Sequence, residues 1–186
     1  MNNNDDVIAQ MIDWMQHRYF GKYRGIVVAN ADPTHRGRLK VKVESVLDSL
    51  EVWALPCVPY AGKNVGLFAM PPKDSGVWIE FEGGDISFPI WVGCFWADKE
   101  APNDGDPAFK VWKTDAITLT LDDKDDTVLL ENSSSASVKM TREVVTTATK
   151  GKHSVKTTGV TTEIGGGKLE VTSASVRLMD GAMEVK

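Results

Sequence analysis

The sequence predicts an all-β protein that begins with one short helix and continues as two different kinds of β structure. Apolar and polar residues alternate with a period of two along most of the chain, as in strands that bury one face. Glycine, proline and aspartate separate these short runs, as they do at hairpin turns. Aromatic residues and prolines stop before the last third of the chain, so the two parts must build their interiors differently.

Composition and charge exclude several classes of protein. Hydrophobic residues make up 42% and charged residues 25% of the 186 residues, which is typical of a folded globular chain. The most apolar window, 88–97, is far shorter than the roughly 20 residues of a membrane helix. A net charge of −5 disfavours nonspecific binding to nucleic acid. The two cysteines, Cys57 and Cys94, are too few for a disulfide scaffold, and we expect both to be buried free thiols.

A break in composition divides the chain near residue 112. The six Trp, six Phe and three Tyr all lie at or before Trp112, and the last of the eight prolines is Pro107. The segment ADKEAPNDGDPAF between the halves is rich in Pro, Gly and Asp, as linkers are. We therefore predict an N-terminal helix in 1–19, a barrel in 20–98, a linker in 99–112 and a second β region in 113–186.

The first element is a predicted helix over residues 5–18. Apolar residues recur there at spacings of three, four and seven behind Asp5 and Asp6, which suit a helix N-terminus. The apolar face consists of Val7, Met11, Trp14 and Met15. Two interpretations of this face stay open: it closes one end of the barrel, or it docks on another protein.

Short strands follow the helix. The runs at 22–30, 38–45, 52–58, 66–70, 76–82 and 88–95 are separated by turn-forming residues. About five short strands in roughly 80 residues predict a small closed β-barrel. The residues whose alternation assigns them to its core are Val27, Leu39, Val41, Val43, Val77, Ile79 and Phe81.

The second β region is rich in Thr, Val and Ser but has no aromatic residue to fill a core. Each of its short runs presents one thin apolar row, which a single chain cannot cover on all sides. Identical chains wound together would bury these rows on a common axis, so we expect a fibrous, intertwined oligomer. The inward-facing residues, called here the predicted needle core, are Ile117, Leu119, Leu121, Val128, Leu130, Val155, Leu169, Val171, Val176 and Leu178.

Four segments of the front half carry a resemblance to a known family. These are GKYRGIVVANADPTHRGRLKVKVESV, WALPCVPYAG, MPPKDSGVWIEFEGGD and FPIWVGCFW, in this order over about residues 20–97. They are similar to the baseplate assembly protein V family, the central spikes of contractile phage tails and related injection systems, including type VI spikes. The resemblance implies an oligonucleotide/oligosaccharide-binding (OB) barrel that trimerises and continues into a needle, a triple-stranded β-helix.

The resemblance also implies a function and partners. We expect a non-enzymatic homotrimeric spike without cofactors, located in a phage tail baseplate or an injection particle. It would be anchored under a baseplate hub protein and would pierce the target cell envelope on contraction. Some family spikes carry a lysozyme domain between barrel and needle, but only the short linker stands there in this chain. The C-terminus SVRLMDGAMEVK lacks the paired histidines of some family tips, so a separate PAAR-type tip protein is expected.

The alternative function is binding of single-stranded nucleic acid. Basic residues alternate along one predicted strand, and three tryptophans of the barrel could stack on bases. These residues are Arg36, Arg38, Lys40, Lys42, Trp53, Trp78 and Trp91. The excess of acidic residues over basic ones in the front half favours a solvated strand face instead, and we expect no nucleic-acid partner.

No pattern of catalytic residues stands out, so we expect no enzyme. Glu80 and Glu82 share one strand face at a spacing of two residues, which resembles a carboxylate pair for glycoside hydrolysis. The simpler interpretation is that both lie on the solvent-exposed side of a barrel strand. The run Asp122–Asp126 lacks the glycine and distal glutamate of a calcium loop, which favours a solvated turn. The three glycines at 165–167 could contact a phosphate, but no helix follows them to supply an N-terminal dipole. We therefore expect a turn there.

One histidine has two interpretations. His153 shares the parity of Val155 and Thr157, so in a trimer three copies could meet on the axis and bind a metal or an anion. Alternatively, Gly151 resets the strand parity and leaves His153 on the surface.

Overall fold

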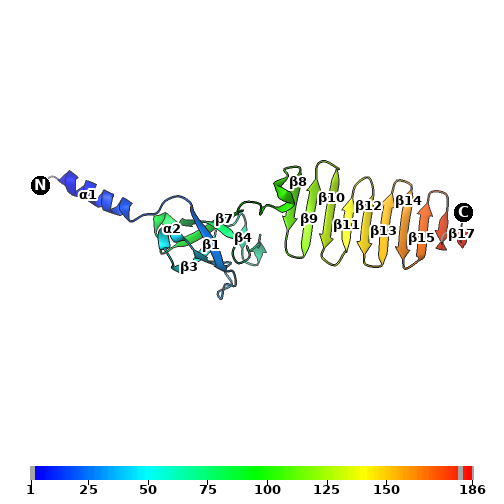
Figure 1. Ribbon diagram of the computed structural model, residues 1–186, viewed down its shortest axis with the longest axis horizontal. Helices are drawn as coiled ribbons and strands as arrows, with labels where there is room; N and C mark the ends of the chain where they lie inside the picture. Colours follow the sequence, from blue (N-terminus) through cyan, green and yellow to red (C-terminus); the bar gives the residue numbers. More distant parts are fainter. Residues whose placement is uncertain (1–2, 180–181, 186) are drawn as a thin grey trace. The chain divides into compact units, whose positions relative to one another are not determined.

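The computed structural model describes residues 3–179 and 182–185. The chain divides into two compact units, Met1–Asp98 and Lys99–Lys186 (Figure 1). Unit 1 contains a helix and a barrel, and unit 2 contains one long sheet. The all-β class, the short N-terminal helix and the closed barrel are thereby confirmed.

Unit 1 begins with helix α1, Asn3–Gln16, where the periodicity predicts a helix over 5–18. Its side chains from Val7 to Gln16 are all exposed. The apolar face of α1 therefore does not close the end of the barrel. Neither α1 nor any other helix in the described part of the chain has the length and apolar composition to cross a membrane.

The barrel has five strands, as predicted. They are β1 (Tyr23–Ala29), β2 (Leu39–Lys42), β3 (Glu51–Pro56), β6 (Gly76–Phe81) and β7 (Pro89–Phe95). The closed order is β1-β2-β3-β7-β6, with β1 and β6 completing the ring. Neighbouring strands are antiparallel except β3 and β7, which run parallel.

The core of the barrel follows from alternation within these strands. In β6 the residues Val77, Ile79 and Phe81 are buried while those between them are only partly buried. Strand β2 continues the pattern with Leu39 and Val41. The seven residues assigned to the core from the sequence all lie in one buried cluster, together with Ala54 and Trp91.

Several local expectations for unit 1 are wrong. Residues 66–70 do not form a barrel strand: only β4 (Ala61–Gly62) and β5 (Val65–Gly66) pair, as a small separate hairpin. Parallel pairing of β3 with β7 closes the ring without that segment, and Pro71 and Pro72 after it have no N–H to donate to a ladder. Cys57 and Cys94 are exposed, not buried, because Cys57 follows the end of β3 and Cys94 lies at an outward-facing position of β7.

Two short helical segments also interrupt the predicted runs. Helix α2 spans Glu44–Leu47, at the end of the run 38–45. The 3₁₀ turn η1 spans Glu82–Gly84, so Glu82 lies beyond strand β6 and does not share its face with Glu80. The side chain of Glu80 instead pairs with Lys22.

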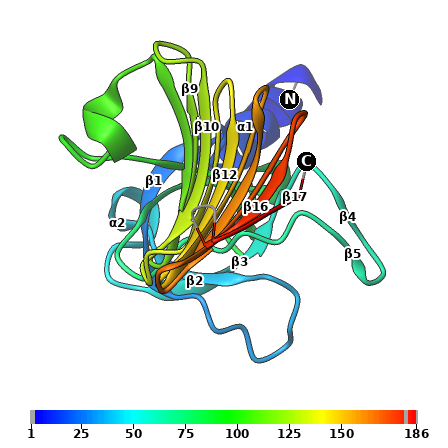
Figure 2. The same cartoon turned by 90° about the vertical axis from the view of Figure 1, so that its right-hand side faces the viewer.

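Unit 2 is a single antiparallel sheet in which each strand pairs with its neighbours in sequence (Figure 1). Figure 2 shows these strands stacked one behind another in a single layer. The strands are β8 (Phe109–Lys113), β9 (Ile117–Asp122), β10 (Thr127–Asn132), β11 (Ser137–Met140), β12 (Val144–Ala148), β13 (Gly151–Lys156), β14 (Gly159–Ile164), β15 (Gly167–Thr172), β16 (Val176–Leu178) and β17 (Met183–Val185).

The start of this sheet differs from the predicted linker 99–112. The 3₁₀ turn η2 spans Pro102–Gly105, and β8 already begins at Phe109. Phe109, Val111 and Trp112 thus belong to the sheet, paired with β9.

Tight turns connect the strands of unit 2. Between β14 and β15, Gly165 has φ 55° and Gly166 has φ 95°, a pair of positive values that two-residue hairpins need and glycine adopts without strain. The acidic run at 122–126 forms the turn between β9 and β10, where Asp122 Oδ1 accepts the backbone N–H of Lys124 at 2.9 Å. The predicted turn at 165–167 is therefore present.

The described residues of unit 2 form no hydrophobic core of their own. Among the described residues, every buried hydrophobic side chain belongs to the barrel. The buried residues of unit 2 are two serines, Ser154 and Ser175. The ten strands of unit 2 form one sheet, and the described residues of this unit add no second layer of strands to it.

Candidate functional site

The candidate functional site is one face of the C-terminal sheet, which the strand register defines. Residues paired across antiparallel strands point to the same side of a sheet. Following the pairs from β8 to β17 traces an unbroken row, called here the central row. Its members are Trp112, Leu119, Leu130, Val138, Thr146, His153, Thr162, Leu169, Leu178 and Met183.

A second row, called here the valine row, runs beside the central row on the same face. Each member lies two residues from a central-row member on the same strand. The row consists of Lys110, Leu121, Val128, Met140, Val144, Val155, Val160, Val171, Val176 and Val185. After Lys110 it is apolar on every strand. The two rows together are called the apolar face.

The apolar face is exposed in the single chain. Its exposed large side chains range from 37% exposed for Val138 to 64% for Val185. An apolar patch that crosses ten strands is far larger than the scattered hydrophobic residues of an ordinary surface. The face therefore has the chemistry of an interface and not of a solvated surface.

The register places nine of the ten residues of the predicted needle core in the two rows, and the tenth, Ile117, on the same side of the sheet. Leu119, Leu130, Leu169 and Leu178 lie in the central row, and Leu121, Val128, Val155, Val171 and Val176 in the valine row, with Ile117 one step further out opposite Asn132. Val144 and Val160 were not assigned from the sequence. Two consecutive valines at 144 and 145 hide the parity of that strand, and only the pairing of Val144 with Val155 reveals it.

His153 also lies on the apolar face. Gly151 pairs with Ala148 and His153 with Thr146 in one continuous register, so the glycine does not reset the parity. The next neighbour in the row is Thr162, whose Oγ1 lies 2.9 Å from His153 Nδ1. Three polar residues therefore stand together in an otherwise apolar row.

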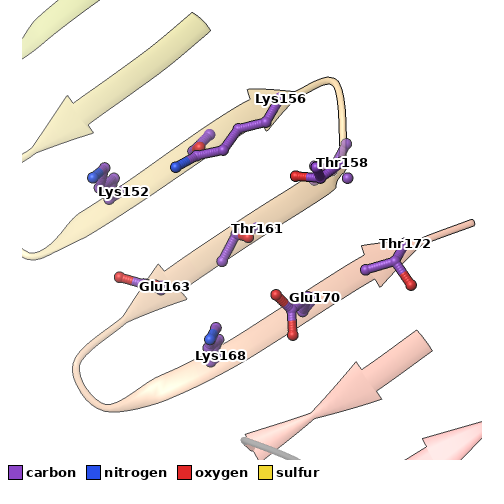
Figure 3. A pocket seen from close by; sticks show the side chains of 11 residues that line it. Lys152, Lys156, Thr158, Thr161, Glu163, Lys168, Glu170 and Thr172 are labelled. Carbon is purple, nitrogen blue, oxygen red and sulfur yellow. The ribbon is translucent and has the colours of Figure 1, made fainter. Parts of the chain in front are cut away.

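The opposite face of the sheet is mainly polar and carries alternating charges on β13 to β15. Lys152, Glu163 and Lys168 are direct neighbours on β13, β14 and β15, so opposite charges face each other across the strands. A shallow trough of about 430 Å³ lies over these strands, lined by lysine, glutamate and threonine (Figure 3). Such a row of alternating charges is suited to contact with water.

One ion pair ties the edge of this polar face. Lys156 Nζ lies 2.9 Å from Glu143 Oε2, and Ser154 Oγ donates to the same carboxylate oxygen at 3.5 Å. The hydrogen bond from Lys156 holds the pKa of Glu143 below its ordinary value.

In unit 1, most residues of the nucleic-acid hypothesis have partners within the same unit. Lys40 pairs with Glu51 at 2.7 Å and Lys42 with Glu44 at 2.8 Å. Arg38 stacks on Trp53 with its guanidinium carbon 5.1 Å from the ring centre. Trp91 is buried and its Nε1 donates to Gly37 O at 3.1 Å. Trp78 packs against Phe95, with their ring centres 5.0 Å apart.

A carboxylate that the sequence analysis missed organises the hairpin before β2. Asp32 Oδ1 accepts from Arg38 Nη2 at 2.8 Å and from the backbone N–H of Thr34 at 3.0 Å, while Oδ2 accepts from the backbone N–H of Arg36 at 2.8 Å. The hydrogen bonds from Arg38 hold the pKa of Asp32 far below its usual range. The available signal was an aspartate followed two residues later by a turn N–H, as in an Asx-turn.

Exposed apolar side chains also surround the β4–β5 hairpin. A hollow of about 510 Å³ there is lined by Tyr60, Leu67, Phe68, Met70 and Trp91 among others. Phe68 is 80% exposed. Within the described residues of one chain, no group of three or more His, Cys, Asp or Glu side chains is placed to hold a metal ion.

Fold and site define a class: a protein with an OB-like barrel, followed by a long β-rich region. Residues 23–96 match the family model of the type VI secretion system/phage-baseplate injector OB domain. The match covers the barrel, which confirms the resemblance for this part of the chain and supports a structural role of the baseplate or spike kind in general. A comparison with curated proteins found no match.

Proposed function

We propose that the chain is the central spike of a contractile tail or injection machine, and that three copies form a needle through their apolar faces. The observation that carries this proposal is the pair of rows that cross all ten strands of unit 2, with most of their large apolar side chains exposed in the single chain. The match of the barrel to injector OB domains supports the same function.

Three sheets with their apolar faces turned inward would bury both rows on one axis. The polar face, with its alternating lysine and glutamate, would then face water on each side of the needle. Within the chain, each strand already pairs with its sequence neighbours, so side-chain packing and not interstrand hydrogen bonding would hold the three sheets together. The resemblance to spike proteins favours three copies over two.

The dimensions of the sheet suit a needle. Ten strands spaced by about 4.8 Å give a length of roughly 43 Å. Ladder hydrogen bonds lie perpendicular to the strands, and so they run along this length. The strands shorten from six residues in β15 to three in β16 and β17, so the sheet narrows toward its C-terminal end.

The proposal extends to the two ends of the spike. Exposed apolar residues of α1 and of the β4–β5 hairpin are available for contact with a hub protein. In unit 2, Met179 is exposed after β16 and Met183 and Val185 are exposed on β17, as a surface covered by a separate PAAR-type tip protein would be. On contraction the needle would pierce the envelope of the target cell by mechanical force, without catalysis.

Light scattering of the full chain over a range of concentrations tests the proposal. We expect a persistent mass near three times the 20.4 kDa of one chain. A monomer, or a dimer that does not change with concentration, would contradict the trimeric needle. A double variant with Lys152→Ala and Lys168→Ala, on the polar face, is the control that should leave the mass unchanged.

A further inference from the structure

We propose that the three copies of His153 in the spike bind one transition-metal ion on the needle axis. The inference rests on the proposed trimer, and goes beyond it by assigning a metal site to a particular layer. Its starting point is the interruption of the central row by Thr146, His153 and Thr162, which follow one another on β12, β13 and β14.

The position of His153 in the central row would bring its three copies together between apolar layers. In the row, Val138 precedes Thr146 and Leu169 follows Thr162, so apolar layers lie on both sides of the polar one. A polar group taken out of water in such a core is unfavourable unless it finds a partner. Three imidazoles brought to the axis therefore need something to bind.

The hydrogen bond of His153 leaves the correct nitrogen available. Nδ1 lies 2.9 Å from Thr162 Oγ1. In the tautomer with the proton on Nδ1, this nitrogen donates to the hydroxyl and Nε2 keeps its lone pair. Histidines that bind metals are oriented in this way by a second hydrogen bond, which fixes the ring and the tautomer.

The neighbouring residues give the imidazole room on this face. Gly151, two residues before His153 on the same strand, presents no side chain to that side of the ring. Val155, two residues after it, belongs to the valine row and would close the layer on the other side. On its own strand the ring therefore has a side chain beside it only at Val155, while the side chain of Ile164 from β14 lies over Gly151.

The chemistry of this set favours a transition metal. Three neutral imidazole nitrogens suit Zn²⁺, Co²⁺, Ni²⁺ or Cu²⁺, with water in the remaining position. Since each chain supplies a single nitrogen, the site would exist only in the assembled spike. The ion would join the three chains at mid-needle and act as a structural pin.

Metal analysis of the untagged full chain, dialysed against Zn²⁺ and then against buffer without chelator, tests the site. We expect about one Zn²⁺ per three chains, and none in His153→Val, which replaces the ring by a side chain that fits the apolar row. His35→Ala removes a barrel histidine and should leave the metal content unchanged. Bound Co²⁺ should give the visible absorption of a low-coordinate nitrogen site, lost in His153→Val.

Thr162→Val gives a second, independent readout. Without the partner of Nδ1, the affinity for Zn²⁺ should fall by about 10- to 100-fold while the trimer persists. A trimer that binds no Zn²⁺, or binds it equally well in His153→Val, would overturn the metal site and leave the spike standing. A monomeric wild type would overturn both proposals.

Discussion

Arg38 Nη2 lies 2.8 Å from Asp32 Oδ1, and the same guanidinium stacks on the ring of Trp53. The pair joins the hairpin before β2 to strand β3, on which Trp53 lies. Asp32 is almost fully enclosed in this arrangement, with its side chain 4% exposed. An arginine and a tryptophan that could contact nucleic acid are thus part of the internal support of the barrel.

The first prediction concerns this pair. Asp32→Asn should lower the melting temperature of unit 1 by several degrees, because Arg38 loses its charged acceptor. Since the pKa of Asp32 is lowered by folding, its contribution is complete above the unfolded value of about 3.9 and is lost as pH falls below it. The difference between wild type and variant should therefore stay constant from pH 7 to 5 and shrink below about pH 4. Tryptophan fluorescence during thermal unfolding measures it.

Asp98→Asn is the matched control for this experiment, since Asp98 is an exposed aspartate of the same unit. It should melt like the wild type at every pH. An Asp32→Asn variant that does so as well would show that the hydrogen bonds to Arg38 contribute nothing to stability.

The second prediction concerns the valine row. In the proposed trimer, Val171→Asp would place three like charges near the axis, at a cost of about 3 kcal/mol or more for each buried, unpaired charge. Glu170→Ala changes the adjacent residue on the opposite face, where Glu170 pairs across the strands with Arg177, and should have a small effect. Thermal unfolding and light scattering of both variants provide the comparison. Equal stability would mean that the apolar face is not an interface.

The third prediction concerns the backbone of the sheet. Gly159 has φ 155°, and a methyl group there would lie 2.3 Å from Val171 O. Gly159→Ala should therefore destabilise unit 2 by roughly 1–3 kcal/mol. Gly151→Ala, whose added carbon would meet a flexible Ile164 side chain at 3.3 Å, should cost less. Denaturant unfolding followed by circular dichroism would rank the two, and the reverse order would refute the expected clash.

The fourth prediction concerns the thiols. Both cysteines are exposed, so a thiol reagent should titrate two groups per chain without denaturant. Partial burial raises the pKa of the Cys94 thiol, which lowers its thiolate fraction at pH 8. Cys94 should react more slowly than Cys57, and the single variants Cys57→Ser and Cys94→Ser assign the two rates. Faster reaction at Cys94 would contradict this prediction.

The fifth prediction separates the two units. A fragment of residues 1–98 should remain folded and largely monomeric, because the buried hydrophobic residues of the described chain belong to the barrel. Its tryptophan fluorescence should show a cooperative unfolding transition, and its mass should be that of one chain. A stable trimer of this fragment would assign the oligomerising element to the barrel instead of the sheet.

The alternation of apolar and polar residues predicts which face of a strand is buried, and this prediction needs no knowledge of distant parts of the chain. Val77, Ile79 and Phe81 are buried because they share one parity of one strand, and the same rule gathers Leu169 and Val171 on the apolar face. Register adds what alternation alone lacks. Only the pairing of Thr146 with His153 and of His153 with Thr162 shows that three polar residues form one layer.

The errors arise where tertiary pairing decides. Residues 66–70 have strand-forming composition, but β7 takes the position beside β3 and leaves no partner for them. Cys57 is exposed because β3 already ends at Pro56, and this strand end is not visible in the local pattern. The role of Asp32 is not visible in the alternation of apolar and polar residues, because its partners, Thr34, Arg36 and Arg38, converge only when the hairpin is closed.

The strictly sequential pairing of β8 to β17 makes the sheet modular in length. Each hairpin adds two strands to the end of what is already folded, and no strand must be threaded between two earlier ones. Insertion or loss of one complete hairpin would preserve both rows and change the sheet by about 9.6 Å, twice the strand spacing. The length of the sheet can therefore change in evolution by one hairpin at a time, without any change in the barrel.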